Sequence, residues 1–289
     1  MKRRSVSRGT GDPKRTTKAF ARTAVLFLAT LVLGCATVIE PRPWLPEPGP
    51  FDHAELDLVQ QRFVDDRGRV DYDGLARDRK ALDRYYLRLA AVSPRSHPAA
   101  FPTREDELAY WINAYNAAVL VTVLEHYPID SVADVKAPIV LRLFLFGKAR
   151  LAGFFYFQHV RLGGENMSLY ELENEIIRGY GEPRIHFAIN CASVGCPFLP
   201  RHAFSPERLD AELDGEARRF FASPEKLLVE HEPRIIRVSP LLDWFREDFG
   251  GDLLAYVRRY VSPERRAELD RAADYELRFM AYDWGLNRQ

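Results

Sequence analysis

Cysteine is scarce in this sequence, with Cys35, Cys191 and Cys196 the only three among 289 residues. Four residues separate His186 from Cys191 and Cys191 from Cys196, and this spacing matches no common zinc pattern. Beyond residue 35, no apolar run approaches the ~20 residues that a membrane-spanning helix needs. The sequence also has no internal repeat and only one proline-rich stretch. These absences favour one soluble-type globular domain over repeat or multi-span architectures.

The short apolar run from Val25 to Leu33 follows a strongly basic leader. The leader carries eight Lys and Arg residues against one acid, Asp12. A positive leader, a short apolar run and a small-residue junction are typical of a secretory signal, and Leu33-Gly34-Cys35 is typical of a bacterial lipoprotein. A twin-arginine signal, or a signal peptide with an incidental Cys, are the alternatives. We expect a signal peptide over residues 1–34 and acylation of Cys35, for example with palmitate.

Loss of the leader changes the charge of the protein. The whole chain has 41 basic and 41 acidic residues. Without the leader, the part from Cys35 onward has 33 basic and 40 acidic residues, a formal charge of −7. A mildly acidic surface repels phosphate backbones, which argues against a nucleic-acid partner. Ala36 follows the expected anchor, and lipoproteins kept at the inner membrane usually carry Asp there. We therefore expect a lipid anchor at the outer membrane, facing the periplasm.

A proline-rich segment separates the expected anchor from the rest of the chain. Residues 35–50 include five prolines between Glu40 and Pro50, which favour an extended, semi-rigid tether. Residues 51–289 are long enough for one globular domain with a sizeable core. Periodicity predicts more helices than strands, with the strands in local pairs. The predicted fold is α+β, a helix-rich domain around a small, mainly antiparallel sheet.

Apolar spacing and cap residues place the expected elements. Thr103 and Asp106 resemble a capping box that begins a helix ending near Tyr127. Helices are also predicted over 54–64, 74–92, 168–179, 206–221, 241–249, 253–261 and 263–273, and strands over 154–162, 184–190, 227–230, 235–238 and 277–282.

A base, an amide and two thiols are concentrated between His186 and Pro197. If 184–190 is a strand, His186 and Asn190 share one face, and Cys191 opens the following loop. Three interpretations of the cysteines remain open: a Cys191–Cys196 disulfide, a nucleophilic cysteine activated by a histidine, and a metal site.

Other polar residues lie in apolar surroundings. Asn113 and Asn116 are at i and i+3 of the predicted long helix, beside Tyr115, and either tie the helix to neighbouring backbone or line a pocket. Asp283 lies between two aromatic residues and either orients a histidine or caps a turn. His159, on a predicted strand, is either a second candidate base or a structural residue.

Five segments carry a resemblance to a known family: YWINAYNA, SLYELENEIIR, PRIHFAINCASVGCP, WFREDFGG and YDWGLN. In this order and spacing, over roughly residues 109–287, the chain resembles the domain of unknown function 547 family. The resemblance supports a single domain and implies no activity. The family usually has a His where this chain has Asn174, so no catalytic role is assigned to that position.

These observations lead to two hypotheses of function. In the first, the domain is a thiol-dependent hydrolase or acyl transferase in which Cys191 attacks, His186 or His159 takes the proton, and Asn190 or Asp283 assists. In the second, it is a non-catalytic envelope binding or structural module braced by a Cys191–Cys196 disulfide. Neither requires a cofactor or a metal. The membrane is an expected partner through the lipid, and any small-molecule or envelope partner is unknown.

Overall fold

The computed structural model describes residues 36–41, 51–138 and 151–289. The predicted signal peptide, Cys35 and most of the tether lie outside the described residues. The chain divides into two compact units at Thr37, and the account below concerns the second, Val38–Gln289.

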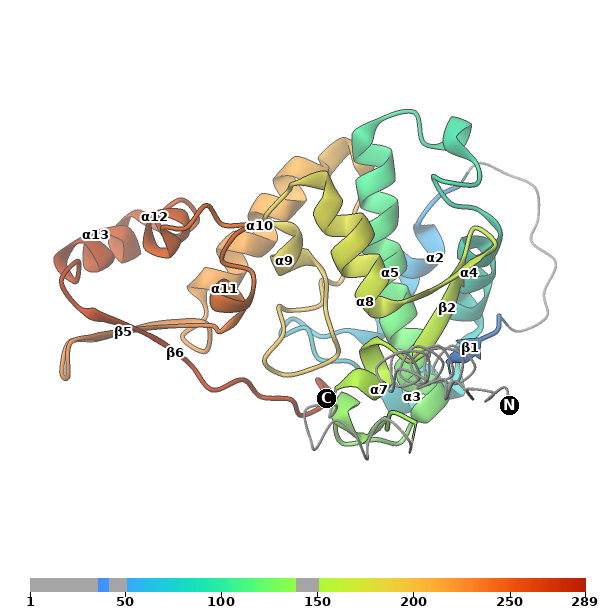
Figure 1. Cartoon of the computed structure of the whole chain (residues 1–289), viewed down its shortest axis with the longest axis horizontal. Coiled ribbons are helices and arrows are strands. Elements are labelled where there is room, and N and C mark those ends of the chain that lie inside the picture. The colour runs from blue at the N-terminus through green and yellow to red at the C-terminus, as the bar shows by residue number, and fades with distance from the viewer. Residues whose placement is uncertain (1–35, 42–50, 139–150) are drawn as a thin grey trace, which may run out of the picture. The chain divides into compact units, whose positions relative to one another are not determined.

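Helix α5 (Arg104–His126) is the central element of the domain (Figure 1). The Thr103 side chain accepts from the Asp106 amide, and Asp106 accepts from the Thr103 amide, which confirms the predicted capping box. The helix is buried almost all round, from Leu108 to Leu124, because other elements pack on every side. It ends one residue before Tyr127, as the following proline predicts.

The elements before residue 181 pack around α5 in one hydrophobic core. Strands β2 and β3 pair antiparallel, and β1 completes a three-stranded sheet in the order β1-β2-β3. The Ser168 capping box begins a helical stretch that passes through a π-helical turn, η3, and ends at Gly181 with φ +63°. These elements are β1 (Thr37–Ile39), α2 (Ala54–Phe63), α3 (Tyr72–Arg77), α4 (Lys80–Ala91), η1 (Pro98–Ala100), η2 (Val132–Asp134), α7 (Ala152–Phe155), β2 (Gln158–Leu162), β3 (Glu165–Ser168), α8 (Leu169–Glu171), η3 (Leu172–Ile177) and η4 (Arg178–Tyr180).

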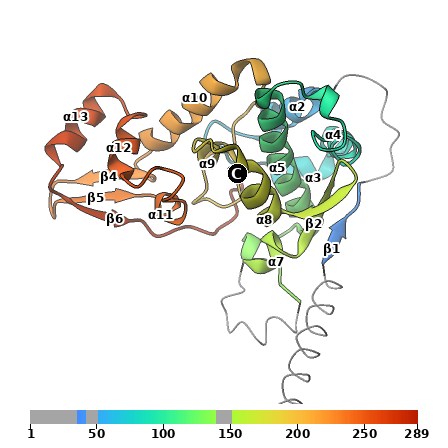
Figure 2. The same ribbon diagram turned by 45° about the horizontal axis from the view of Figure 1, so that its top comes forward.

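The C-terminal elements form a second core at the other end of this unit (Figure 2). Strands β4 and β5 form an antiparallel hairpin, and β6 pairs parallel with β5. Helices α12 and α13 lie beside this sheet in both views. The elements are α9 (Ile185–Ala188), η5 (Pro206–Arg208), α10 (Leu209–Ala222), β4 (Leu227–Glu230), β5 (Ile235–Val238), α11 (Leu241–Trp244), α12 (Leu253–Arg258), α13 (Pro263–Arg271) and β6 (Glu276–Phe279).

The α+β prediction is confirmed, with differences in detail. The described strands form two three-stranded sheets instead of one. The predicted helix over 74–92 is two helices, α3 and α4, separated at Asp78 and Arg79. The predicted strand over 154–162 begins as helix α7 and is extended only from Gln158.

The predicted strand over 184–190 is wrong, because Ile185–Ala188 is the short helix α9. The Asn116 side chain donates to the Ala188 carbonyl at 3.0 Å and accepts from the Asn190 amide at 2.9 Å. A side chain therefore satisfies the backbone groups that a strand would offer to a neighbouring strand. The expected common face of His186 and Asn190 is lost with the strand.

Candidate functional site

A cavity of about 320 Å³ lies where η3, α9, the Cys191–Cys196 loop, α11 and the C-terminal segment meet. Its described walls are mostly aromatic and apolar, with few polar groups. Glu173, Asn174 and His186 contribute side chains that can hydrogen-bond or carry charge. An apolar hollow with a few convergent polar groups is the usual form of a small-molecule site.

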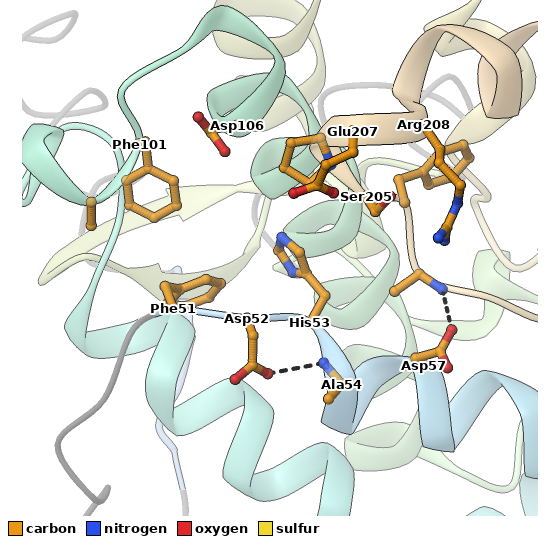
Figure 3. Close-up of a pocket in the computed structure, with 14 residues that line it drawn as sticks. Phe51, Asp52, His53, Ala54, Asp57, Phe101, Asp106, Ser205, Glu207 and Arg208 are labelled. Atoms are coloured by element: carbon orange, nitrogen blue, oxygen red, sulfur yellow. Dashed lines mark hydrogen bonds between the residues drawn. The ribbon is translucent and has the colours of Figure 1, made fainter.

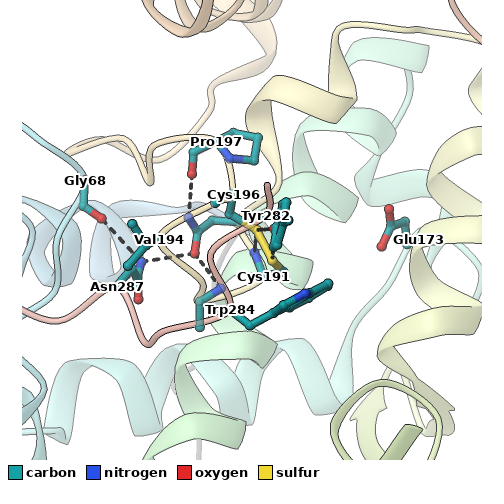
Figure 4. Close-up of a disulfide and its surroundings, with 12 residues drawn as sticks. Gly68, Glu173, Cys191, Val194, Cys196, Pro197, Tyr282, Trp284 and Asn287 are labelled. Carbon is teal, nitrogen blue, oxygen red and sulfur yellow. Dashed lines mark hydrogen bonds between the residues drawn. A yellow bond between two sulfur atoms is a disulfide. The ribbon is translucent and has the colours of Figure 1, made fainter. Parts of the chain in front are cut away.

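Glu173 lies on the π-helical turn η3, an irregularity that often occurs at functional sites. In Figure 4 its carboxylate points across the cavity toward Tyr282 and the disulfide. The Tyr115 hydroxyl donates to Oε2 at 3.2 Å. Desolvation raises the pKa of Glu173 to about 7, and the Tyr115 hydrogen bond and the Arg178 charge offset this only in part. The carboxyl therefore takes up or releases a proton near neutral pH.

His186, Asp248 and Arg178 form a connected group at the edge of the cavity. His186 Nε2 lies 2.7 Å from Asp248 Oδ2, and Arg178 donates from Nε and Nη2 to the two oxygens of the same carboxylate. Hydrogen bonds from His186 and Arg178 hold the pKa of Asp248 well below its usual range. Burial lowers the pKa of His186, whose ring stacks on Phe245 at 3.9 Å. Burial thus favours the neutral ring, whereas the hydrogen bond to Asp248 opposes this shift and fixes the orientation of the ring.

Cys191 and Cys196 form a disulfide, with Cα atoms 6.1 Å apart. The Tyr282 hydroxyl lies 3.1 Å from each sulfur atom. A Cβ at Gly195 would approach the Tyr282 ring to 2.9 Å, so the loop can pack on this ring only with glycine there.

Lys226 supports the same loop through its ammonium group. It donates to the carbonyls of Val194 and Gly195 at 3.1 and 2.7 Å. Burial lowers the pKa of this lysine to about 8. The loop is therefore fixed by a covalent bond, a buried cation and an aromatic ring.

Aromatic side chains form the rim of the cavity. Tyr156 and Tyr170 stack with ring centroids 4.3 Å apart, and Trp244 and Trp284 stack at 5.8 Å. Tyr156 and Trp244 are each 48% exposed and Tyr170 is 37% exposed. Large aromatic rings in contact with water present flat faces to a ligand.

Four residues predicted from the sequence line this cavity: Cys191, Cys196, His186 and Tyr115. Asn190 is turned away, because its amide donates to the Pro197 carbonyl at 2.6 Å and accepts from the Ala192 amide at 2.8 Å. These bonds shape the loop, so Asn190 is not placed to stabilise an oxyanion.

The remaining predicted residues also lie away from the cavity. The Asp283 carboxylate accepts from the Gly285 amide at 2.8 Å and caps a turn; the carboxylate that contacts His186 is that of Asp248. His159 lies on β2 opposite Ser168. Asn113 bonds the amide and carbonyl of Phe204, and Asn116 bonds Ala188 and Asn190, so both bury their amides against backbone.

Sequence reasoning missed Glu173, Arg178 and Asp248 as site residues. Glu173 and Arg178 lie in the SLYELENEIIR segment and Asp248 in WFREDFGG. The resemblance noted for these two segments is the one signal in the sequence that pointed to them, because the residues around Glu173 and Asp248 do not reveal their distant partners.

A second cavity, of about 380 Å³, lies beside α2 and η5 (Figure 3). Two of the acids that line it accept from backbone amides: Asp52 from the Ala54 amide and Asp57 from the Ala203 amide. His53 Nδ1 lies 2.7 Å from the Tyr85 hydroxyl, and burial lowers the pKa of His53 to about 4. These contacts hold the chain segments together and leave no free ligating group among them.

The described part of the chain has neither a metal-binding group of side chains nor a membrane-spanning helix. Over residues 36–41, 51–138 and 151–289, no three His, Cys, Asp or Glu side chains are grouped so as to hold a metal ion. In the same residues, no helix has the length and apolar character needed to cross a membrane.

Comparison with known proteins gives one match. Residues 99–221 match the family model described as "Protein of unknown function, DUF547". Residues 99–221 are called the DUF547 region below, after this match. The match includes Tyr115, Glu173, His186 and both cysteines of the disulfide, and it ends before Asp248, Trp244 and Tyr282. Neither the curated proteins nor the solved structures gave a match.

Proposed function

We propose that the domain binds a small organic molecule in the aromatic cavity, and that acylated Cys35 anchors it to the outer membrane on the periplasmic side. The observation that carries the binding role is the distribution of exposed apolar groups. Among the described residues, four large apolar side chains are exposed, and three of them, Tyr156, Tyr170 and Trp244, line the one cavity. Exposed aromatic groups gathered at a hollow are typical of a binding site.

The disulfide favours binding over thiol chemistry. A nucleophilic mechanism needs a free thiolate, and both sulfur atoms are joined to each other. The bond instead stiffens the cavity wall that Tyr282 and Lys226 also support. A thiol-dependent hydrolase or acyl transferase would require the reduced protein.

The anchoring part of the proposal rests on the leader. Its basic residues, its short apolar run and the Leu33-Gly34-Cys35 junction favour cleavage and acylation. A disulfide is also typical of proteins outside the cytoplasm.

Calorimetric titration of the full-length, detergent-solubilised protein tests binding. We would use four probes that share a benzene ring: meta-(hydroxymethyl)phenyltrimethylammonium, meta-tert-butylbenzyl alcohol, meta-hydroxybenzoate and phenyl glucoside. We expect at least one to bind saturably at millimolar concentration or below. Trp244→Ala should weaken that binding by about tenfold, since it removes one aromatic face.

Leu58→Ala is the matched control, because Leu58 is the fourth exposed large apolar residue and does not line the cavity. It should bind the probes as the parent does. The binding role would be refuted if none of the four probes bound, or if Trp244→Ala and Leu58→Ala bound them equally well.

A further inference from the structure

The Glu173 carboxylate forms no ion pair with a described residue, and the charge of Arg178 offsets its desolvation only in part. Its one hydrogen bond within the domain is from the neutral Tyr115 hydroxyl. The nearest guanidinium, Arg178, is already engaged: it donates to both oxygens of Asp248 and to Asn174 Oδ1 at 2.9 Å. A desolvated carboxylate without a counter-charge is costly, so the site favours whatever supplies one.

The other walls of the cavity suit a positive charge equally well. The rings of Tyr115, Tyr282 and Trp284 line the interior, and Trp244, Tyr156 and Tyr170 line the rim. The face of an aromatic ring carries partial negative charge and attracts ammonium and guanidinium groups. Neither Lys nor Arg occurs among the described lining residues, and the one histidine, His186, is buried against Asp248. The described walls of the cavity therefore carry one acid, many rings and no Lys or Arg.

We infer that the cavity takes an organic cation, an ammonium or amidinium group on an apolar or aromatic body, with the charge at Glu173 and the body between the aromatic rings. This inference rests on the proposed binding function and specifies its ligand. The cation supplies the ion-pair partner that the described residues do not provide, and the rim rings cover the apolar part. An anion would meet the Glu173 carboxylate, and a neutral body would leave that carboxylate without a counter-charge.

A matched pair of probes tests the charge requirement. The meta-(hydroxymethyl)phenyltrimethylammonium cation and meta-tert-butylbenzyl alcohol have nearly the same shape, carry no group that titrates between about pH 6 and about pH 8.5, and differ by one positive charge. At about pH 8.5, where Glu173 is ionised, the full-length protein should bind the cation about tenfold more tightly than the neutral isostere. In Glu173→Gln this preference should disappear, with binding of the neutral probe unchanged.

Glu175→Gln is the matched control. Glu175 lies on the same π-helical turn, is exposed, and its loss changes the net charge by the same amount. It should keep the full preference for the cation, which separates a local contact from a general electrostatic effect.

The pH dependence of the parent protein provides a measurement without a variant. Cation binding should strengthen about tenfold between about pH 6 and about pH 8.5, because the carboxyl of Glu173, with its pKa near 7, loses its proton over this range. The described groups around Glu173 keep their charge: burial raises the pKa of Tyr115 and Tyr282, Asp248 and Arg178 hold each other ionised, and burial keeps His186 neutral. Binding of the neutral isostere should not change with pH.

The outcomes distinguish this inference from the function on which it rests. If the neutral alcohol, the benzoate or the glucoside binds in a Trp244-dependent way and the cation does not bind more tightly, the inference is wrong and the binding function stands. If Glu173→Gln and the parent prefer the cation equally, Glu173 is not its partner, and the inference is also wrong. If no probe binds, the binding function itself fails.

Discussion

At the scale of single residues, burial decides which ionisable groups of the cavity are available for chemistry. Glu173 and Asp248 are both carboxylates near Arg178, yet desolvation raises the pKa of the first and hydrogen bonds lower that of the second. The Asp248 carboxylate accepts hydrogen bonds from Arg178 and contacts His186, whereas the Glu173 carboxylate accepts one hydrogen bond, from Tyr115. The difference in pKa comes from partners that are distant in sequence, so the residues next to either acid do not predict it.

The cysteines, in contrast, could be placed by sequence. Only two remain after Cys35, they are five positions apart, and an oxidising compartment favours their pairing. His186, predicted as a candidate base, lines the cavity, and the predicted strand that was to orient it is the helix α9.

The oxidation state of the two cysteines can be measured directly. Protein exported to the periplasm and treated with iodoacetamide should carry no label on Cys191 or Cys196 until a reductant is added, because the two sulfur atoms are joined. Mass spectrometry of the unreduced protein should find the peptides linked.

The thiol-nucleophile hypothesis predicts the opposite result. Cys191 would then alkylate near neutral pH without reductant, because a thiolate needs a pKa below the free value of about 8.5. His186→Ala would slow that reaction and His159→Ala, on β2, would not. Such a result would favour the thiol-dependent hydrolase or acyl transferase over the binding function.

At the scale of elements, local signals were sufficient where the chain supplies its own partners. The capping boxes of α5 and α8 and the β4–β5 hairpin satisfy their backbone groups within a few residues, and their predicted positions agree with the structure. Helix α9 has no such local partner. The backbone groups at its end are hydrogen-bonded by the Asn116 side chain, more than seventy residues earlier in the chain. Periodicity over five residues cannot detect such a partner.

Asn113 and Asn116 act as side-chain bridges between α5 and two irregular segments. The Asn113 side chain bonds both the amide and the carbonyl of Phe204. The Asn116 side chain accepts from the Asn190 amide and donates to the Ala188 carbonyl. Substitution by leucine leaves both backbone groups buried and unpaired. We expect Asn113→Leu and Asn116→Leu each to lower the free energy of unfolding by about 1–3 kcal/mol for each orphaned group. Urea unfolding followed by circular dichroism measures this.

Asn166→Leu is the control for these variants, because Asn166 is exposed on β3. Its unfolding free energy should stay within about 0.5 kcal/mol of the parent value. Equal stability of all three variants would show that the buried amides do not carry the bridging role.

At the scale of the whole molecule, the cavity joins two cores. Tyr115 and Cys196 come from the DUF547 region, whereas Trp244 and Tyr282 come from the C-terminal elements beyond residue 221. The α+β class and a single main domain follow from element periodicity. The meeting of two cores at one cavity does not, because it depends on long-range packing that no single segment encodes.

The leader allows a prediction about the location of the molecule. Cleavage before Cys35 and acylation of its thiol and amine would provide the several acyl chains that stable membrane anchoring needs. Cys35→Ser removes the thiol, so we expect an uncleaved precursor that incorporates no labelled palmitate. Globomycin-type inhibition of lipoprotein processing should also leave the precursor uncleaved in the parent protein.

The matched control is Cys196→Ser, which removes a thiol from the domain and should still be processed and labelled. Membrane fractionation should place the parent in the outer membrane. Normal palmitate labelling of Cys35→Ser would rule out the lipoprotein hypothesis, and cleavage without labelling of the parent would identify a plain secretory signal.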